Sequence, residues 1–87
     1  MKPQEKILFV IIMLFRKTVP INGIKMTFYY VNQIVDMLEN CGYSRKQLLY
    51  YLSKWEKKGF YEYGVGLEYG WLKEKDIPQA YLDLMSF

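Results

Sequence analysis

A helix start at residue 44 constrains the fold of this chain more than any other local feature of its sequence. The segment 44–47, Ser-Arg-Lys-Gln, is a capping box, in which the Ser44 hydroxyl accepts a hydrogen bond from the Gln47 N–H and the Gln47 side chain reaches back. Gly42 stands where a left-handed residue would end a preceding helix. The sequence therefore predicts two separate helices joined by the short turn 41–43, and not one continuous rod.

Apolar residues on both sides of this turn recur at helical spacing. Before the turn they predict a helix over about 27–40 with Thr27 as its N-cap, and they are Phe28, Val31, Ile34, Val35 and Leu38. After the turn the helix is predicted over about 44–58, and its apolar face consists of Leu48, Tyr51, Leu52 and Trp55. Gly59 is expected to end this second helix.

The first part of the chain contains an unbroken apolar run from Ile7 to Phe15. The run is about half the roughly 20 residues that a transmembrane helix needs, and no small-residue cleavage pattern follows it. We therefore expect a core helix over about 3–17 and no membrane association, with a signal or membrane segment as the alternative. Because apolar residues cover nearly every face of this helix, they also indicate a subunit contact.

Breakers and a change of period define the remaining segments. Pro20 and Asn22-Gly23 predict a connection over 18–26 with at most a short edge strand. Past Gly59 the pattern alternates and is rich in aromatics, which predicts a two-stranded hairpin over about 60–72.

The hairpin is expected to reverse tightly at Gly64-Val65-Gly66, whose glycines can supply positive φ angles. A short last helix is predicted over about 77–85, with Asp76 as its cap.

The composition excludes several classes of function. A chain of 87 residues has room for one domain, so we predict a single domain over 1–87. The chain has no His and one Cys, which excludes an imidazole base, a His-bearing metal site, an internal disulfide and a zinc knuckle. We therefore expect no enzymatic activity, no metal and no cofactor. The single thiol, Cys41, fits a reducing compartment, so the expected location is the cytoplasm.

The order helix, connection, helix, short turn, capped helix, glycine and hairpin resembles a winged helix-turn-helix domain of bacterial transcription regulators. The stretch Leu52 to Phe60, LSKWEKKGF, is similar to the end of the recognition helix in that family, with Trp55 where a Leu usually stands. The resemblance covers Thr27 to Leu72. It implies an α+β, mostly helical fold with a three-helix core, a two-stranded hairpin wing and a short C-terminal helix.

The resemblance also implies a function. The third helix would lie in the major groove of double-stranded DNA, as in a small transcriptional or mobile-element regulator, and many such proteins act as dimers on two half-sites. Here a homodimer would form through the first helix and the C-terminal helix.

The residues of the third helix can be compared with that expectation. Opposite its apolar face, the helical projection places one stripe of four residues, Lys46, Tyr50, Ser53 and Lys57, flanked by Gln47 and Lys54 on one side and by Arg45 and Leu49 on the other. Lys and Arg can neutralise phosphates, Ser and Tyr can bond phosphate oxygens or base edges, and Leu can contact a thymine methyl. These eight residues are the predicted DNA-binding set, although a Lys-bearing stripe is also typical of an ordinary solvated surface.

Other features favour a different use of the same fold. The predicted wing carries Glu62 and Glu68 and has no Lys or Arg between Gly59 and Leu72, and the second helix turns Asp36 and Glu39 toward solvent. A nearby DNA backbone would repel Asp36 and Glu39. The acidic wing, a Leu49 expected to be exposed and the apolar first helix favour a protein-interaction module with no role in nucleic-acid binding.

Overall fold

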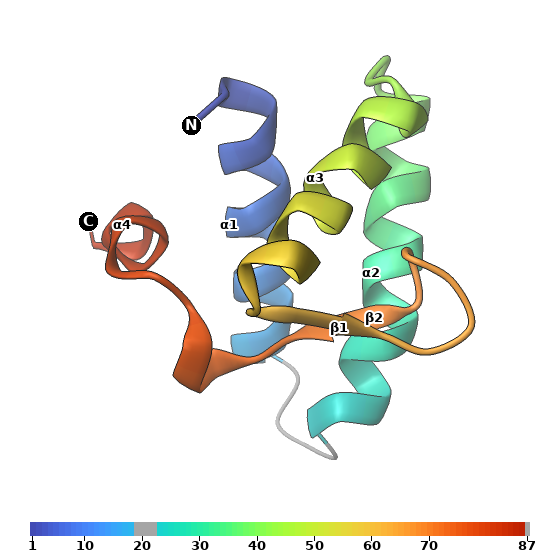
Figure 1. Cartoon of the computed structure of the whole chain (residues 1–87). Helices are drawn as coiled ribbons and strands as arrows, with labels where there is room; N and C mark the ends of the chain where they lie inside the picture. The colour runs from blue at the N-terminus through green and yellow to red at the C-terminus, as the bar shows by residue number, and fades with distance from the viewer. Residues whose placement is uncertain (19–22, 87) are drawn as a thin grey trace.

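The computed structural model describes the backbone of residues 1–18 and 23–86 and the side chains of residues 1–15 and 31–86. The described chain is a small α+β fold of helices and one antiparallel hairpin (Figure 1). In chain order its elements are α1 (Pro3–Thr18), α2 (Gly23–Asn40), α3 (Arg45–Lys58), β1 (Tyr61–Tyr63), β2 (Gly70–Leu72), the 3₁₀ turn η1 (Glu74–Asp76), α4 (Gln79–Leu82) and the 3₁₀ turn η2 (Asp83–Met85).

The helices α1 and α2 lie side by side, and α3 crosses in front of both (Figure 1). The hairpin lies below α3, with β1 against α3 and β2 against α2. The segment containing α4 and η2 lies on the side of α1 that faces away from α2. In this arrangement one side of α3 faces the core and the opposite side faces solvent.

Among the described side chains, the core is built from the apolar faces that the sequence predicts; the side chain of Phe28, a predicted core residue, lies outside the described residues. Trp55 lies at its centre, with its ring edge-on to Phe9 at 5.7 Å and stacked on Phe60 at 5.9 Å between ring centroids. All four residues of the predicted α3 face are buried. The other buried apolar residues among the described side chains are Leu8, Phe9, Ile12, Met13, Val31, Ile34, Val35, Leu38, Phe60, Tyr61, Leu72, Ile77 and Tyr81.

The turn between α2 and α3 confirms the predicted break at Ser44. The Ser44 hydroxyl accepts a hydrogen bond from the Gln47 N–H at 3.3 Å, while the Gln47 side chain makes no return bond within the described residues. Gly42 has a φ of +103°, and the N–H of Tyr43 reaches the carbonyl of Leu38 at 3.0 Å, which closes α2 with a Schellman motif. Ser44 therefore opens a helix that is separate from α2.

Gly59 ends α3 in the same way. Its φ is +94°, and the N–H of Phe60 bonds the carbonyl of Trp55 at 3.2 Å. The predicted range of this helix is confirmed at both ends.

The start of α2 differs from the prediction. The helix begins at Gly23, one turn before the expected Thr27, so the predicted connection over 18–26 is wrong for residues 23–26. Residues 24–26, Ile-Lys-Met, contain no helix breaker, and glycine is tolerated at a helix start. Residues 19–22 of the predicted connection lie outside the described residues.

The hairpin forms, but its turn is longer than expected. Three residue pairs join the strands, Tyr61 with Leu72, Glu62 with Trp71 and Tyr63 with Gly70. The connection runs over 64–69 and is closed by a bond from the Gly64 N–H to the Tyr69 carbonyl at 3.0 Å. The expected positive φ angles at Gly64 and Gly66 are wrong, since only Gly42 and Gly59 have positive φ in the described chain.

Side-chain packing explains this longer turn. The buried Tyr61 side chain donates a hydrogen bond to the carbonyl of Leu67 and so holds the connection over its own ring. The strand β2 passes so close that a Cβ on Gly70 would lie 2.2 Å from the Glu62 carbonyl oxygen.

The C-terminal helix is shorter than predicted. In place of one helix over 77–85 capped by Asp76, the chain forms η1, an extended Ile77 and Pro78, the single-turn α4, and η2. Pro78 has no N–H and biases the residue before it toward extended backbone, so the helix starts only after it. Asp76 instead pairs with Lys73 at 3.4 Å.

Candidate nucleic-acid interface

The solvent-facing side of α3 carries the predicted stripe. Lys46 and Lys57 are exposed and Tyr50 is 59% exposed, while Ser53 is half-buried between them. Neither lysine forms an ion pair with any described residue. The structure therefore brings the four stripe residues onto one solvent-facing side of α3, opposite the side on which Trp55 is buried.

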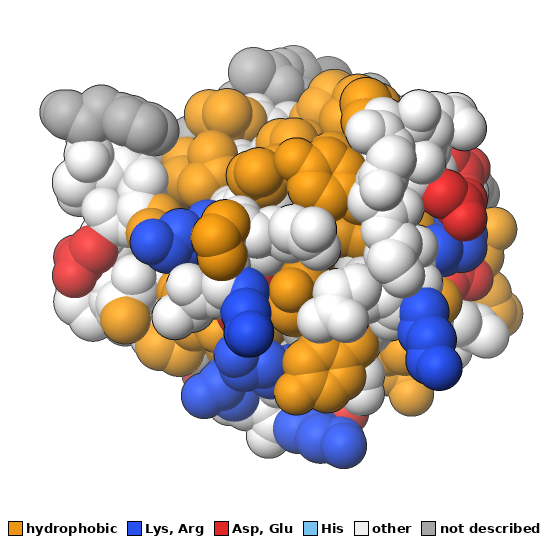
Figure 2. Space-filling view, turned by 90° about the horizontal axis from the view of Figure 1, so that it is seen from above, with side chains coloured by type: hydrophobic (Ala, Val, Ile, Leu, Met, Phe, Trp, Pro, Cys, Tyr) orange, Lys and Arg blue, Asp and Glu red, His pale blue; other side chains and the backbone are white. Residues whose placement is uncertain are grey.

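Lys58 joins this surface, although the sequence projection did not select it. Its side chain is exposed and unpaired among the described residues, and it lines a hollow of about 260 Å³ together with Tyr50, Ser53, Lys54 and Lys57. The signal for it was a pair of adjacent lysines in the last helical turn, where cations also complement the helix dipole. Figure 2 shows cationic side chains gathered along the lower part of that view, with acidic side chains mainly at the two sides.

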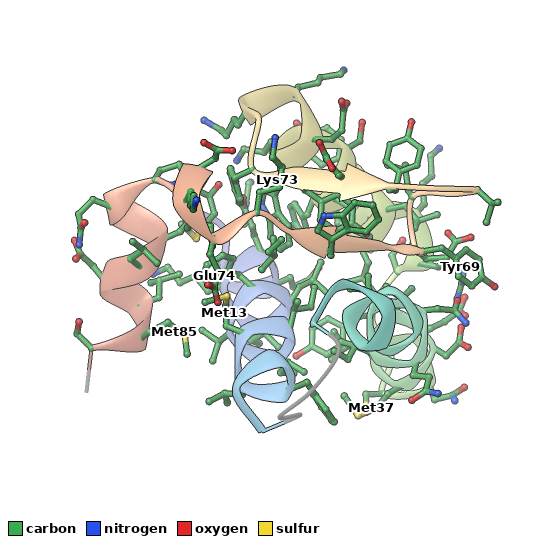
Figure 3. All side chains as sticks on the ribbon, turned by 90° about the horizontal axis from the view of Figure 1, so that it is seen from below. Met13, Met37, Tyr69, Lys73, Glu74 and Met85 are labelled. Carbon is green, nitrogen blue, oxygen red and sulfur yellow. The ribbon has the colours of Figure 1, made fainter. Side chains whose placement is uncertain are left out.

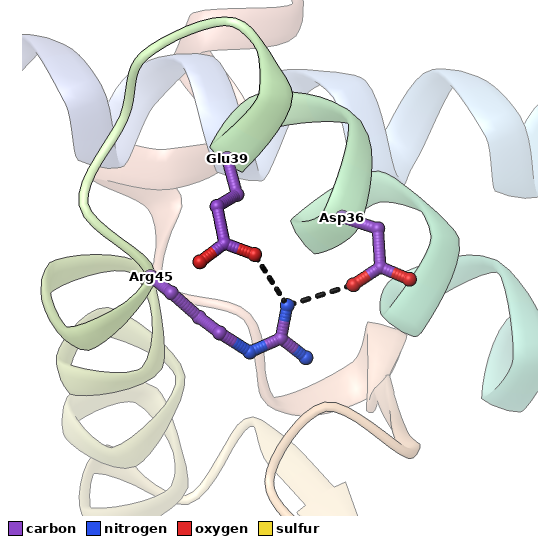
Figure 4. A network of polar contacts seen from close by, with 3 residues as sticks. All are labelled: Asp36, Glu39 and Arg45. Atoms are coloured by element: carbon purple, nitrogen blue, oxygen red, sulfur yellow. Dashed lines mark hydrogen bonds and ion pairs between the residues drawn. The ribbon is translucent and has the colours of Figure 1, made fainter.

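Arg45 takes no part in this free surface. Its Nη1 lies 2.7 Å from Asp36 Oδ1 and 3.2 Å from Glu39 Oε1, so it joins the start of α3 to the end of α2 (Figure 4). The hydrogen bond to Asp36, helped by Glu39, raises the pKa of Arg45 against the opposing effect of burial. Two carboxylates around one guanidinium leave a local excess of negative charge. Arg45 is therefore not a free cation, and its predicted contact with DNA stays a prediction.

Lys54 also forms an ion pair, with Glu5, a residue that the sequence analysis did not select. Its Nζ lies 3.1 Å from Oε1 of Glu5, a side chain that is 0% exposed. Oε2 of Glu5 accepts hydrogen bonds from Trp55 Nε1 at 2.8 Å and from the Tyr81 hydroxyl at 2.7 Å. One carboxylate thus joins α1, α3 and α4.

The charge state of this carboxylate follows from its contacts. Burial acts to raise the pKa of Glu5, but the hydrogen bonds from Tyr81, Trp55 and Lys54 and the charge of Lys54 outweigh it, and the net pKa is lowered. Burial and the bond to Glu5 raise the pKa of Tyr81, so its hydroxyl remains a donor. The sequence did hold a signal, because position 5 falls on the α1 face that contains Leu8, Phe9 and Ile12.

Gln47 and Leu49 lie at the edges of the α3 surface. Leu49 is half-buried against the core, one turn after Arg45 on the same side of the helix, so the expectation that it is exposed is wrong. Gln47 is half-buried and borders a hollow of about 490 Å³ between the starts of α1 and α3. That hollow is lined by Lys2, Pro3, Gln4, Ser44, Gln47 and Tyr51.

The hairpin adds no positive charge to this surface. Figure 3 shows Tyr69 at the far end of the hairpin and Lys73 at its other end, where the chain leaves β2. Glu62 of β1 pairs with Lys73 at 3.4 Å. Lys73, the cation that follows β2, is therefore already paired with carboxylates.

Comparisons with known proteins identify no relative of this chain. No family model, curated protein or solved structure matches the chain. Among the described helices, none has the length and apolar character needed to cross a membrane. Within the same residues, no group of three or more His, Cys, Asp or Glu side chains could hold a metal ion.

Proposed function

We propose that the chain binds double-stranded DNA as a small winged-helix protein, a regulator of transcription or of a mobile element, with α3 in the major groove. The observation that carries this proposal is the solvent-facing stripe on α3, in which Lys46 and Lys57 have no carboxylate partner among the described residues. The helix that bears the stripe follows a tight turn and precedes a hairpin, which agrees with the resemblance to winged helices.

Whether each side chain of α3 is already paired with a carboxylate indicates its role in DNA binding. Lys46, Lys57 and Lys58 are the free cations of α3 and would neutralise phosphates, while Tyr50, Ser53 and Gln47 offer groups that bond phosphates or base edges. Arg45 and Lys54 are held by carboxylates and contribute less. If each of these three lysines neutralised a phosphate of its own, log K would fall with log salt at a slope near −2.7, and lysines that share a phosphate would make the slope shallower.

Charge reversal on the stripe tests the proposal. Lys46→Glu and Lys57→Glu should each weaken binding to a labelled duplex by about tenfold or more at low salt, because each replaces an attraction to phosphate with a repulsion. Fluorescence anisotropy across a salt series measures both affinity and slope. Lys75→Glu, an exposed lysine on η1, is the matched control and should change affinity by about twofold or less. Binding that is absent at low salt, or equally weakened by all three changes, would contradict the proposal.

A second candidate is a protein-interaction module on the same fold. The observation that favours it is the outer side of α1, where Ile7 is 37%, Leu14 44% and Phe15 40% exposed. Such an apolar strip, together with the C-terminal segment beside α1, would suit a homodimer. Light scattering of the wild type and of Leu14→Glu tests it: a dimer that dissociates in the variant supports this candidate, and a wild-type monomer at all concentrations contradicts it.

A further inference from the structure

The hollow near the end of α3 has the chemistry of an anion site. Its lining residues provide three ammonium groups and two hydroxyls, and no carboxylate lines it. Its donors come from two successive turns, with Tyr50, Ser53 and Lys54 above Lys57 and Lys58. The hollow has a volume of about 260 Å³ and is open to solvent, so a phosphate group has room to enter it.

Buried residues hold Lys54, one of the residues that line this hollow, in place. Lys54 gives one N–H to the buried Glu5, which Trp55 and Tyr81 hold in turn, so the position of the Lys54 ammonium is set before any ligand arrives. An ammonium has three donors, which leaves two for an anion. Because Glu5 offsets one of the three charges, the remaining attraction comes from Lys57 and Lys58.

We infer that this hollow seats one phosphate of the DNA backbone, which Lys57 and Lys58 neutralise together while Tyr50 and Ser53 donate hydrogen bonds to it. This inference rests on the proposed DNA binding, and it also states how many phosphates the lysines of α3 neutralise. The two lysines share a phosphate, whereas Lys46, at the other end of the stripe, neutralises a phosphate of its own.

The salt dependence of DNA binding distinguishes shared from separate phosphates, because its slope counts neutralised phosphates at about 0.9 each. We expect Lys46→Gln to reduce the slope by about 0.9. Lys57→Gln and Lys58→Gln should each reduce it by clearly less, since the remaining lysine still neutralises the phosphate, and the double variant should reduce it by about 0.9. A double variant that loses about 1.8, or one that loses nothing, would overturn the shared site.

Uncharged variants test the hydroxyl donors. Tyr50→Phe and Ser53→Ala should each weaken binding about 2- to 10-fold with the slope unchanged, as expected for the loss of one hydrogen bond. Unchanged affinity in both would overturn their role in the hollow. These failures differ from a failure of the proposed function, in which the wild type itself would show no salt-dependent binding. All substituted residues are at least partly exposed, and circular dichroism verifies that each variant is folded.

Discussion

At the scale of single residues, Glu5 has the largest structural consequence. Its buried carboxylate accepts hydrogen bonds from Trp55, Tyr81 and Lys54, which belong to two other helices. A buried carboxylate of this kind stabilises the fold only while its donors remain in place, because an unpaired buried charge is costly.

We therefore expect Glu5→Gln to lower the free energy of unfolding by about 1–3 kcal/mol, since an amide replaces a charged acceptor that three donors face. Urea denaturation measures the change. Glu56→Gln, the same substitution at an exposed position of α3, is the matched control and should stay within about 0.5 kcal/mol. Equal effects of the two substitutions would contradict a structural role for Glu5.

The pH dependence of this difference gives a second test. Although burial acts to raise the pKa of Glu5, its hydrogen bonds and the charge of Lys54 bring the pKa below the ordinary value of a glutamate, so folding favours the ionised form. The stabilisation is complete above the pKa of the unfolded chain and is lost as pH falls through the lower folded value. The advantage of the wild type over Glu5→Gln should therefore be constant near neutral pH and shrink in acid. An advantage that grows in acid would show that burial dominates.

At the scale of elements, the hairpin depends on one glycine. A Cβ at Gly70 would lie 2.2 Å from the Glu62 carbonyl oxygen and 2.7 Å from Tyr61 Cζ, so backbone and ring would both have to shift. We expect Gly70→Ala to destabilise the protein by about 1–3 kcal/mol, the usual range for overpacking.

Gly66→Ala is the matched control for this change. The added Cβ would meet the end of the flexible Glu68 side chain at 3.3 Å, which can move aside. Its urea midpoint should stay close to that of the wild type. A Gly70→Ala protein as stable as Gly66→Ala would contradict the close approach of the strands.

The elements that sequence predicted well are those whose ends depend on local chemistry. Ser44 and Gly59 bound α3 through bonds within a few residues, and the periodicity of Leu48 to Trp55 found its buried side. Side-chain contacts that the local pattern does not show decided other features. The hydrogen bond from Tyr61 to the Leu67 carbonyl holds the longer hairpin connection, and no local pattern reveals that Glu5, from the other end of the chain, would bind Lys54.

At the scale of the whole molecule, Trp55 touches most parts of the core at once. Its ring contacts Phe9 of α1, Phe60 before the hairpin, Tyr61 of β1 and Tyr81 of α4. A core joined through one ring should unfold as a single cooperative unit.

The prediction is that Trp55 fluorescence and far-ultraviolet circular dichroism give the same urea midpoint. Trp71 is half-exposed on β2 and would add its own signal, so the experiment uses Trp71→Phe. A fluorescence transition that precedes the loss of helix would show that the aromatic centre loosens before the helices do, and would contradict a single unit.

The pairing of Arg45 with Asp36 and Glu39 has a consequence for how this surface can change. Where α2 ends and α3 begins, the two carboxylates neutralise the positive charge of Arg45. Replacing both acids with amides would free the guanidinium beside the solvent-facing side of α3 without adding a basic residue. If the chain binds DNA as proposed, the removal of negative charge alone would then tighten its association with a polyanion.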